Sequence, residues 1–192
     1  MRDVPQLICG ADLLPLLPHR GKLFLLSRVI AHDIGQNTIT TESDITRDCI
    51  FYDEELEGVP VWAGFEFMAQ SIAALTSIRH ISLELPPPPP GVILSVSGFN
   101  ATQAVLPLGS IVQTTVHEDY RADSLSRFDC ELSLREAPPG SSGIGDADGN
   151  GNRIGNASGS SKANGSGEAK GPLATATMTV MSIPDMHAFF KH

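Results

Sequence analysis

Most of the information in this sequence lies in one run, Pro60-Val61-Trp62-Ala63-Gly64-Phe65-Glu66-Phe67-Met68-Ala69-Gln70-Ser71-Ile72-Ala73-Ala74-Leu75. The pattern predicts a turn followed by a helix over about 64–82 that is apolar nearly all round, which is typical of a helix buried on every side. Glu66 falls in the predicted first turn, where a buried carboxylate is costly unless it is paired, protonated or used. The backbone N–H groups of a first turn lack helical partners and can hold a ligand oxygen. The run therefore predicts a buried acid beside free N–H donors, which is a plausible active site.

A second polar residue, Gln70, follows Glu66 by four positions, so the two share one face of the predicted helix. This spacing leaves two interpretations open. The pair could hydrogen-bond across an interface, or Glu66 could transfer protons. Aromatic residues flank the start of the helix at Trp62, Phe65 and Phe67, and we expect them to line an apolar tunnel beside Glu66 and Gln70.

The segments around the helix have the patterns of strands. Period-two or continuous apolar runs predict strands at 23–30, 38–44, 92–101, 110–119, 127–134 and 174–181. Residues 13–17 predict a short helix closed by Pro18, and the prolines at 86–90 predict a stiff spacer. One long helix against one antiparallel sheet is an α+β layer arrangement.

The length of 192 residues predicts a single domain spanning 1–192. Residues 137–172 are mostly Gly, Ser, Asn and Ala and hold more than half of the 18 glycines. Such a composition buries too little apolar surface to offset its ordering entropy, so we expect a flexible insertion between the last two strands. Residues 146–152 resemble the start of a calcium loop, but Ala157 stands where the twelfth position needs a carboxylate, and no metal is expected.

The overall charge and the cysteines limit the class of protein. A net charge of -9 and a pI of about 5.0 argue against a nucleic-acid partner. No apolar run has membrane-spanning length, and the first residues lack the shape of a signal peptide. The three widely spaced cysteines, Cys9, Cys49 and Cys130, predict buried free thiols in a reducing compartment. We therefore expect a cytoplasmic protein that does not contact membranes.

A further motif, Leu17-Pro18-His19-Arg20, precedes the first predicted strand. His19 could be catalytic. Alternatively, His19 and Arg20 hold the N-terminal turn in place or border a ligand entrance, and we favour that structural role.

Three motifs together resemble a known family. In chain order, Leu17-Pro18-His19-Arg20, Leu25-Leu26-Ser27-Arg28-Val29 and Glu66-Phe67-Met68-Ala69-Gln70 are similar to the 3-hydroxyacyl-acyl carrier protein dehydratases of the hot-dog fold. Ser27 stands where that family usually has Asp. The sequence of residues 62–70 resembles the ApeP-like branch of this family more closely still. That branch is found with aryl-polyene lipid gene clusters. The resemblance covers most of 13–136 and 173–181.

The resemblance implies a long helix wrapped by a curved antiparallel sheet, and a dimer formed by edge-to-edge pairing of sheets with active sites between subunits. In the dehydratases a His of one subunit takes the C2 proton, and a Glu at the helix start of the other protonates the leaving hydroxyl. Glu66 corresponds to that acid, and the N–H of Gly64 to the group that polarises the thioester carbonyl. Gln70, Trp62, Phe65 and His19 are then expected to contact substrate.

The resemblance fails at one catalytic position. The family's His should lie shortly before the helix, yet the sequence has no histidine between His32 and His80. A carboxylate among Asp53, Glu54 and Glu55 could replace it, although a solvated acidic loop is the commoner meaning of such a run.

Three interpretations follow. The chain could be half of a heterodimeric dehydratase whose hot-dog partner supplies the His. It could instead be a thioesterase that uses the helix carboxylate, or a non-catalytic acyl-binding or scaffold subunit. In each case we expect a thioester of acyl carrier protein or coenzyme A as ligand, a homo- or heterodimer, and no cofactor.

Overall fold

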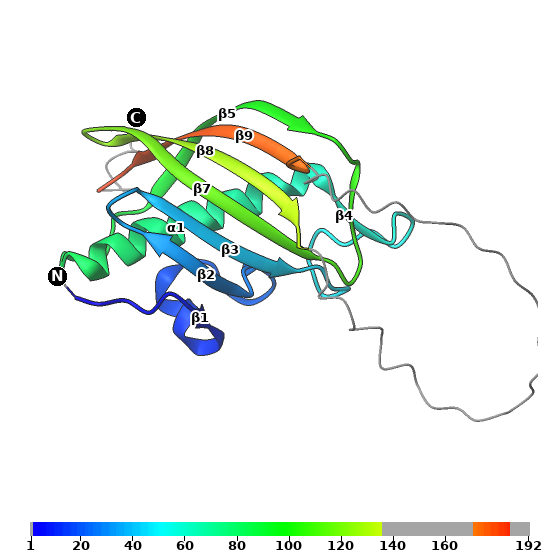
Figure 1. Ribbon diagram of the computed structural model, residues 1–192, viewed down its shortest axis with the longest axis horizontal. Coiled ribbons are helices and arrows are strands. Elements are labelled where there is room, and N and C mark those ends of the chain that lie inside the picture. The colour runs from blue at the N-terminus through cyan, green and yellow to red at the C-terminus, as the bar shows by residue number, and fades with distance from the viewer. Residues whose placement is uncertain (1, 136–170, 185–192) are drawn as a thin grey trace, which may run out of the picture. The chain divides into compact units, whose positions relative to one another are not determined.

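The computed structural model describes residues 2–135 and 171–184 and places one long helix against one large antiparallel sheet (Figure 1). The helix α1 spans Gly64–Ser82. The sheet has seven strands in the order β1-β2-β3-β7-β8-β9-β5. In that order their bounds are Ile8–Cys9, Arg28–Asp33, Thr38–Asp44, Ile111–Ala122, Leu125–Leu134, Ala174–Ser182 and Gly91–Ala101. The predicted α+β class is therefore confirmed.

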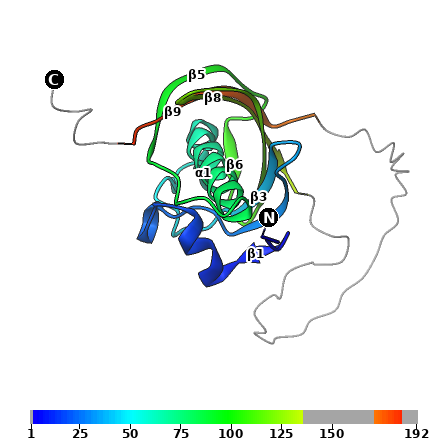
Figure 2. The same ribbon diagram turned by 90° about the vertical axis from the view of Figure 1, so that its left-hand side faces the viewer.

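The sheet curves around α1, which lies in its hollow (Figure 2). Large side chains of the helix, Phe67, Met68, Leu75 and Ile78, are buried in one core with sheet residues that include Ile39, Val112, Phe128, Leu132 and Met178. Burial of each such side chain contributes about 1.5–3 kcal/mol relative to exposure. This wrapped helix is the hot-dog architecture that the resemblance implies.

The helix has the predicted bounds, and each of its residues is buried or partly buried. A 3₁₀ turn at Val61–Ala63 leads directly into it. The helix ends at Ser82 because Glu84 takes a left-handed φ of 55°, the Leu85 N–H donates to the His80 carbonyl, and the proline run follows. Within the described residues, no helix is both long enough and apolar enough to cross a membrane.

The first predicted strand is wrong at both ends. The structure begins β2 at Arg28 and continues it to Asp33, whereas the sequence predicts 23–30. Part of the apolar run before β2 is bound by a side chain of the helix instead of by a neighbouring strand, since the Leu25 N–H donates to Oε1 of Gln70 at 2.9 Å. This bond turns the segment toward the helix.

Three short strands were not predicted: β1 at the sheet edge and two that pair with each other. Strands β4 (Gly58–Pro60) and β6 (Val105–Pro107) form a separate antiparallel pair. The sequence analysis assigned no element to either segment, because a three-residue strand has no measurable periodicity. The pair secures the residues before the helix, and the Val61 N–H also donates to the Ala104 carbonyl at 2.9 Å.

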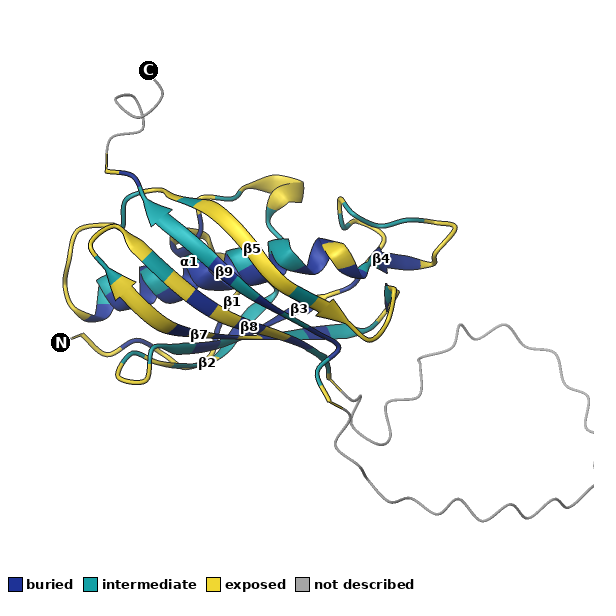
Figure 3. Cartoon of the chain, turned by 90° about the horizontal axis from the view of Figure 1, so that it is seen from above, coloured by how far each residue is buried: buried dark blue, intermediate teal, exposed yellow. Residues whose placement is uncertain are grey.

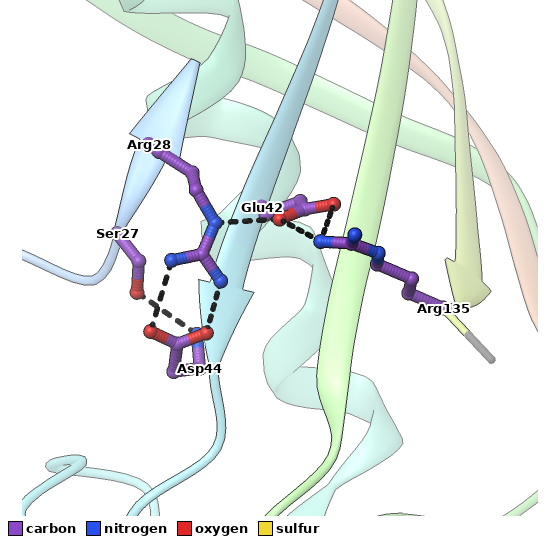
Figure 4. Close-up of polar contacts among 5 residues, drawn as sticks. All are labelled: Ser27, Arg28, Glu42, Asp44 and Arg135. Atoms are coloured by element: carbon purple, nitrogen blue, oxygen red, sulfur yellow. Dashed lines mark hydrogen bonds and ion pairs between the residues drawn. The ribbon is translucent and has the colours of Figure 1, made fainter. Parts of the chain in front are cut away.

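A cluster of charged side chains joins β2, β3 and the residue after β8 (Figure 4). Arg28 donates to Glu42 and to Asp44, each at 2.5 Å, and Arg135 approaches the Glu42 carboxylate at 3.2 Å. The hydrogen bond to Glu42 is the main cause that raises the pKa of Arg28. Ser27 accepts the Asp44 N–H through its hydroxyl. Glu42 and Asp44 thus hold Arg28 although Ser27 replaces the family's usual Asp.

The N-terminal segment packs on the helix through a 3₁₀ helix at Gly10–Leu16, close to the short helix predicted at 13–17. Leu13, Leu16 and Leu17 are buried, and the Ser77 hydroxyl of α1 donates to the Leu16 carbonyl at 2.7 Å. These contacts fix where the following loop, residues 17–25, crosses the helix.

The cysteine prediction holds for one residue of three. Cys130 is buried, and burial raises the pKa of its thiol to about 12. Cys49 is only partly buried and Cys9 is exposed, so the expectation that all three are buried is wrong. Cys9 belongs to the two-residue strand β1 at the edge of the sheet, where one face remains open to solvent.

The predicted insertion at 137–172 and the calcium-like stretch at 146–152 fall almost wholly outside the described residues. The flanking strands β8 and β9 are antiparallel neighbours in the sheet.

Candidate active site

The candidate site begins with Glu66 in the first turn of α1 and Gln70 one turn later. Gln70 is fully buried, and its Nε2 donates to Oε1 of Glu66 at 2.9 Å and to the Leu23 carbonyl at 2.7 Å. Its Oε1 accepts the Leu25 N–H. The two residues share one face of the helix, as the spacing predicts, and Gln70 also fastens the loop 17–25 to that face.

His19 lies beside the acid. Its Nε2 is 3.4 Å from Oε1 of Glu66, while its Nδ1 is buried and has no hydrogen-bond partner among the described residues. Arg20 stiffens the same turn, since its Nη1 donates to the carbonyls of Leu17 and His19. The motif predicts that His19 holds the N-terminal turn or borders a ligand entrance. Its contact with Glu66 is not predicted, because no periodicity relates a loop to a distant helix.

The acid is less buried than the sequence predicts. The side chain of Glu66 is 24% exposed and that of His19 is 27% exposed. A helix that is apolar all round suggested complete burial, but about a quarter of the Glu66 side chain reaches solvent. Both groups are therefore within reach of a ligand.

The aromatic residues at the helix start differ in exposure. Trp62 is 55% exposed and meets Phe51 edge to face, with ring centroids 5.8 Å apart. Phe65 is partly buried and Phe67 belongs to the core. Trp62 and Phe65 thus remain available to an apolar ligand or to a partner surface, whereas Phe67 has a packing role.

Gly64 has a structural reason to be glycine. A Cβ at this position would lie 2.4 Å from Cδ1 of Leu132, so a larger residue would force the buried Leu132 side chain to shift. The Gly64 N–H points into the preceding 3₁₀ turn, toward the carbonyls of Val61 and Trp62. The sequence predicts a free N–H here, but the 3₁₀ turn gives it partners.

The acidic loop before the helix forms a turn around Asp53. Oδ1 of Asp53 accepts the N–H groups of Glu55 and Leu56, at 2.8 and 3.1 Å. Glu54 and Glu55 are exposed. These bonds give Asp53 a turn-forming role, and the exposure of Glu54 and Glu55 fits the solvated acidic loop that the sequence favours.

A long helix wrapped by a curved antiparallel sheet is the hot-dog fold, and here an acid and the glutamine that bonds it lie in the first two turns of that helix. The pattern of the ApeP-like family, described as ApeP dehydratase, matches residues 11–142. The chain therefore belongs to the ApeP-like family.

One relative is similar over part of its length. The chain is 30% identical over 77 residues to the 3-hydroxyacyl-[acyl-carrier-protein] dehydratase FabZ of Chlamydia pneumoniae. That match covers 38% of this chain and spans only 50% of the relative.

Solved structures match the fold. One is the dehydratase heterocomplex ApeI:P from Xenorhabdus doucetiae, with a TM-score of 0.67 at 16% identity, covering 92% of this chain and 94% of that one. Another is the virulence protein Cj0977 of Campylobacter jejuni, with a TM-score of 0.53 at 11% identity, covering 88% and 91%. At these identities the likeness supports the hot-dog fold alone.

Proposed function

We propose that this chain is the acid-bearing subunit of a 3-hydroxyacyl thioester dehydratase, completed by a hot-dog partner that bears the catalytic histidine. The observation that carries the proposal is the carboxyl of Glu66, fixed by Gln70 and open to a ligand at the helix start. Membership of the ApeP-like family supports the reaction class. The ApeI:P dehydratase of Xenorhabdus doucetiae, which shares the fold of this chain, is a heterocomplex and so assembles from unlike subunits.

The proposed reaction removes water from a 3-hydroxyacyl thioester. An imidazole of the partner takes the proton on C2, and the C2–H electrons form the C2=C3 double bond as the C3–O bond breaks. Glu66 gives its proton to the departing hydroxyl, which leaves as water. The proton then held by the imidazole returns to Glu66 through solvent, so the cycle is balanced.

The thioester carbonyl needs a hydrogen-bond donor while charge develops on it. The N–H of Gly64 remains our proposal for this donor. It already faces two carbonyls of the 3₁₀ turn, an arrangement in which one hydrogen is shared. Substrate would replace one of these contacts.

Several apolar side chains on the segments that precede the helix are exposed. Leu23, Ile50, Leu56 and Trp62 are each about half exposed. A partner subunit and an acyl chain both require apolar surface at this position, so we assign Trp62 and Phe65 to contacts with one or both of them.

The test uses the complex isolated through a tag on this chain, assayed with 3-hydroxyacyl thioesters of coenzyme A and of acyl carrier protein. Glu66→Gln keeps the shape and the hydrogen bond from Gln70 but cannot supply the proton. We expect a loss of at least about a hundredfold in the formation of enoyl thioester, the usual size of an acid–base contribution.

Glu54→Gln is the matched control, because it removes an exposed carboxylate from the acidic loop and should leave the rate unchanged. Circular dichroism and recovery of the complex check that both variants fold and bind the partner. A fully active Glu66→Gln complex would show that the carboxylate is structural.

A thioesterase is the second candidate, because an open carboxylate can activate water without an imidazole. Release of free thiol from acyl thioesters by the chain alone, lost in Glu66→Gln, would favour it. Absence of both reactions, alone and in complex, would leave a scaffold role.

A further inference from the structure

We propose that His19 is a positioning residue that donates its Nε2–H to Oε1 of Glu66, and that the proton which Glu66 transfers therefore lies on Oε2. This inference rests on the proposed function. It deepens that function by assigning separate roles to the two carboxyl oxygens and by excluding His19 as the missing base.

The two oxygens of Glu66 have different surroundings. Oε1 faces Nε2 of Gln70 at 2.9 Å and Nε2 of His19 at 3.4 Å. Oε2 has no hydrogen-bond partner within residues 2–135 and 171–184. A contact of 3.4 Å is longer than the usual N–H···O distance of about 3 Å, and catalytic hydrogen bonds commonly tighten once substrate is bound.

The identity of the nitrogen that carries the hydrogen follows from Nδ1 of His19. A neutral imidazole has one N–H and one lone pair. Nδ1 is buried and has no partner among the described residues. A buried N–H without an acceptor costs about 1–3 kcal/mol, and orphaned N–H groups are rarer than unfilled acceptors. The hydrogen is therefore placed on Nε2, which faces Glu66.

This tautomer decides what His19 can do. An Nε2 that already bears a hydrogen has no lone pair with which to take a proton from C2. It can only donate, and the acceptor in front of it is Oε1 of Glu66. The catalytic base must then come from elsewhere, which agrees with a partner that supplies an imidazole.

The hydrogen bond from Gln70 and the longer approach of His19 together determine the reactive form of the carboxyl. A protonated carboxyl has one oxygen that only accepts and one that carries the O–H. Because two N–H donors face Oε1, the O–H lies on Oε2. This oxygen is the one left free to reach the departing hydroxyl.

The loop that carries His19 is built to hold this geometry. Arg20 bonds the carbonyls on either side of the turn, and Gln70 bonds the backbone at Leu23 and Leu25. Gln70 therefore positions both Glu66 and the loop from which His19 approaches. The sequence motif Leu17-Pro18-His19-Arg20 therefore serves to orient the Glu66 carboxyl, in addition to holding its own turn.

The first test reads the tautomer directly and needs no activity. In the ¹⁵N-labelled chain at neutral pH, long-range ¹H–¹⁵N correlation spectra should show His19 as the Nε2–H form, its signals being assigned by their loss in His19→Gln. His32 is an internal reference, because its Nε2 lies 3.0 Å from the Pro5 carbonyl and must carry a hydrogen to bond it. An Nδ1–H form of His19 would overturn the proposal.

The second test separates donation from proton abstraction in the complex. The amide nitrogen of Gln can reproduce the Nε2–H donor but cannot act as a base. His19→Gln should keep kcat within about threefold, whereas His19→Ala should lower it about ten- to a hundredfold, as expected for a misplaced catalytic group. KM should change little, and His32→Gln is the matched control with no expected effect.

Equal, large losses in His19→Gln and His19→Ala, with the fold intact, would identify His19 as the base and overturn the proposal. An unchanged rate in both variants would overturn it as well. If the complex has no dehydratase activity, the proposed function fails while the spectra still decide the tautomer, so the two failures are distinguishable.

Discussion

Gly64 is the residue at which the candidate site and the core meet. Its position opposite Leu132 sets how closely the first turn of α1 approaches β8, and Leu132 is fully buried. Because the core around Leu132 is closed, an added methyl group cannot be accommodated by turning that side chain into solvent. Overpacking of this kind costs about 1–3 kcal/mol.

We predict that Gly64→Ala lowers the free energy of unfolding by about 1 kcal/mol or more. The gain in helix propensity, about 1 kcal/mol at most, offsets part of the packing cost. Denaturant unfolding measures the change. In Leu132→Ala, which opens the space, the same substitution should cost less, so the double-mutant cycle should show favourable coupling. Equal or greater stability of Gly64→Ala would contradict the close approach.

Single residues were predictable where their partners are near in sequence. The contact between Glu66 and Gln70 follows from four-residue spacing on a helix. The contact between His19 and Glu66 does not, because a loop reaches a helix only through tertiary packing. The hydrogen bonds between Gln70 and the backbone of Leu23 and Leu25 could not be predicted from the sequence for the same reason.

At the scale of elements, one buried ion pair joins the end of α1 to β7. Nη2 of Arg79 donates to Oε2 of Glu118 at 2.5 Å and to Oδ1 of Asn37 at 2.9 Å. Both Arg79 and Glu118 are at most 5% exposed. Arg121 also bonds the Glu118 carboxylate from the outer side at 2.8 Å.

We predict that Arg79→Met destabilises the fold by about 3 kcal/mol, because it removes the inner partner of a buried carboxylate. The double variant Arg79→Met with Glu118→Leu removes both charges and should recover most of the loss, measured by chemical denaturation. Arg121→Met, which removes a half-exposed arginine, serves as the control and should cost much less. A loss in the double variant as large as the sum of two single losses would contradict this account.

The long elements were predicted and the short ones were not. The helix at 64–82 and the strands beginning near 38, 92, 110, 127 and 174 have enough residues for a period to be recognised. Strands β1, β4 and β6 are two or three residues long and exist only because a distant strand pairs with them. Arg79 went unnoticed because its partner Glu118 lies on another element.

At the scale of the whole molecule, strand β5 stands at one end of the sheet order, paired with β9 on one side. Figure 3 shows most of this strand exposed. Ile93, Leu94 and Val96 are 37%, 50% and 40% exposed. An exposed edge with apolar side chains is a template for pairing with another chain. The dimer implied by the family resemblance would cover it.

We therefore predict that the assembly forms through β5. Leu94→Lys with Val96→Lys should shift the mass measured by light scattering from that of a dimer to that of a monomer, for the chain alone or with its partner. Charged side chains on an edge strand oppose pairing while they leave the strand itself solvated. Leu125→Lys is the matched control, because Leu125 is 40% exposed but lies on β8, which has strands on both sides.

Because the proposed reaction needs a histidine from the partner, the β5 variant should also lose dehydratase activity while keeping the tautomer of His19. A dimer that survives in the β5 variant would place the interface elsewhere on the molecule.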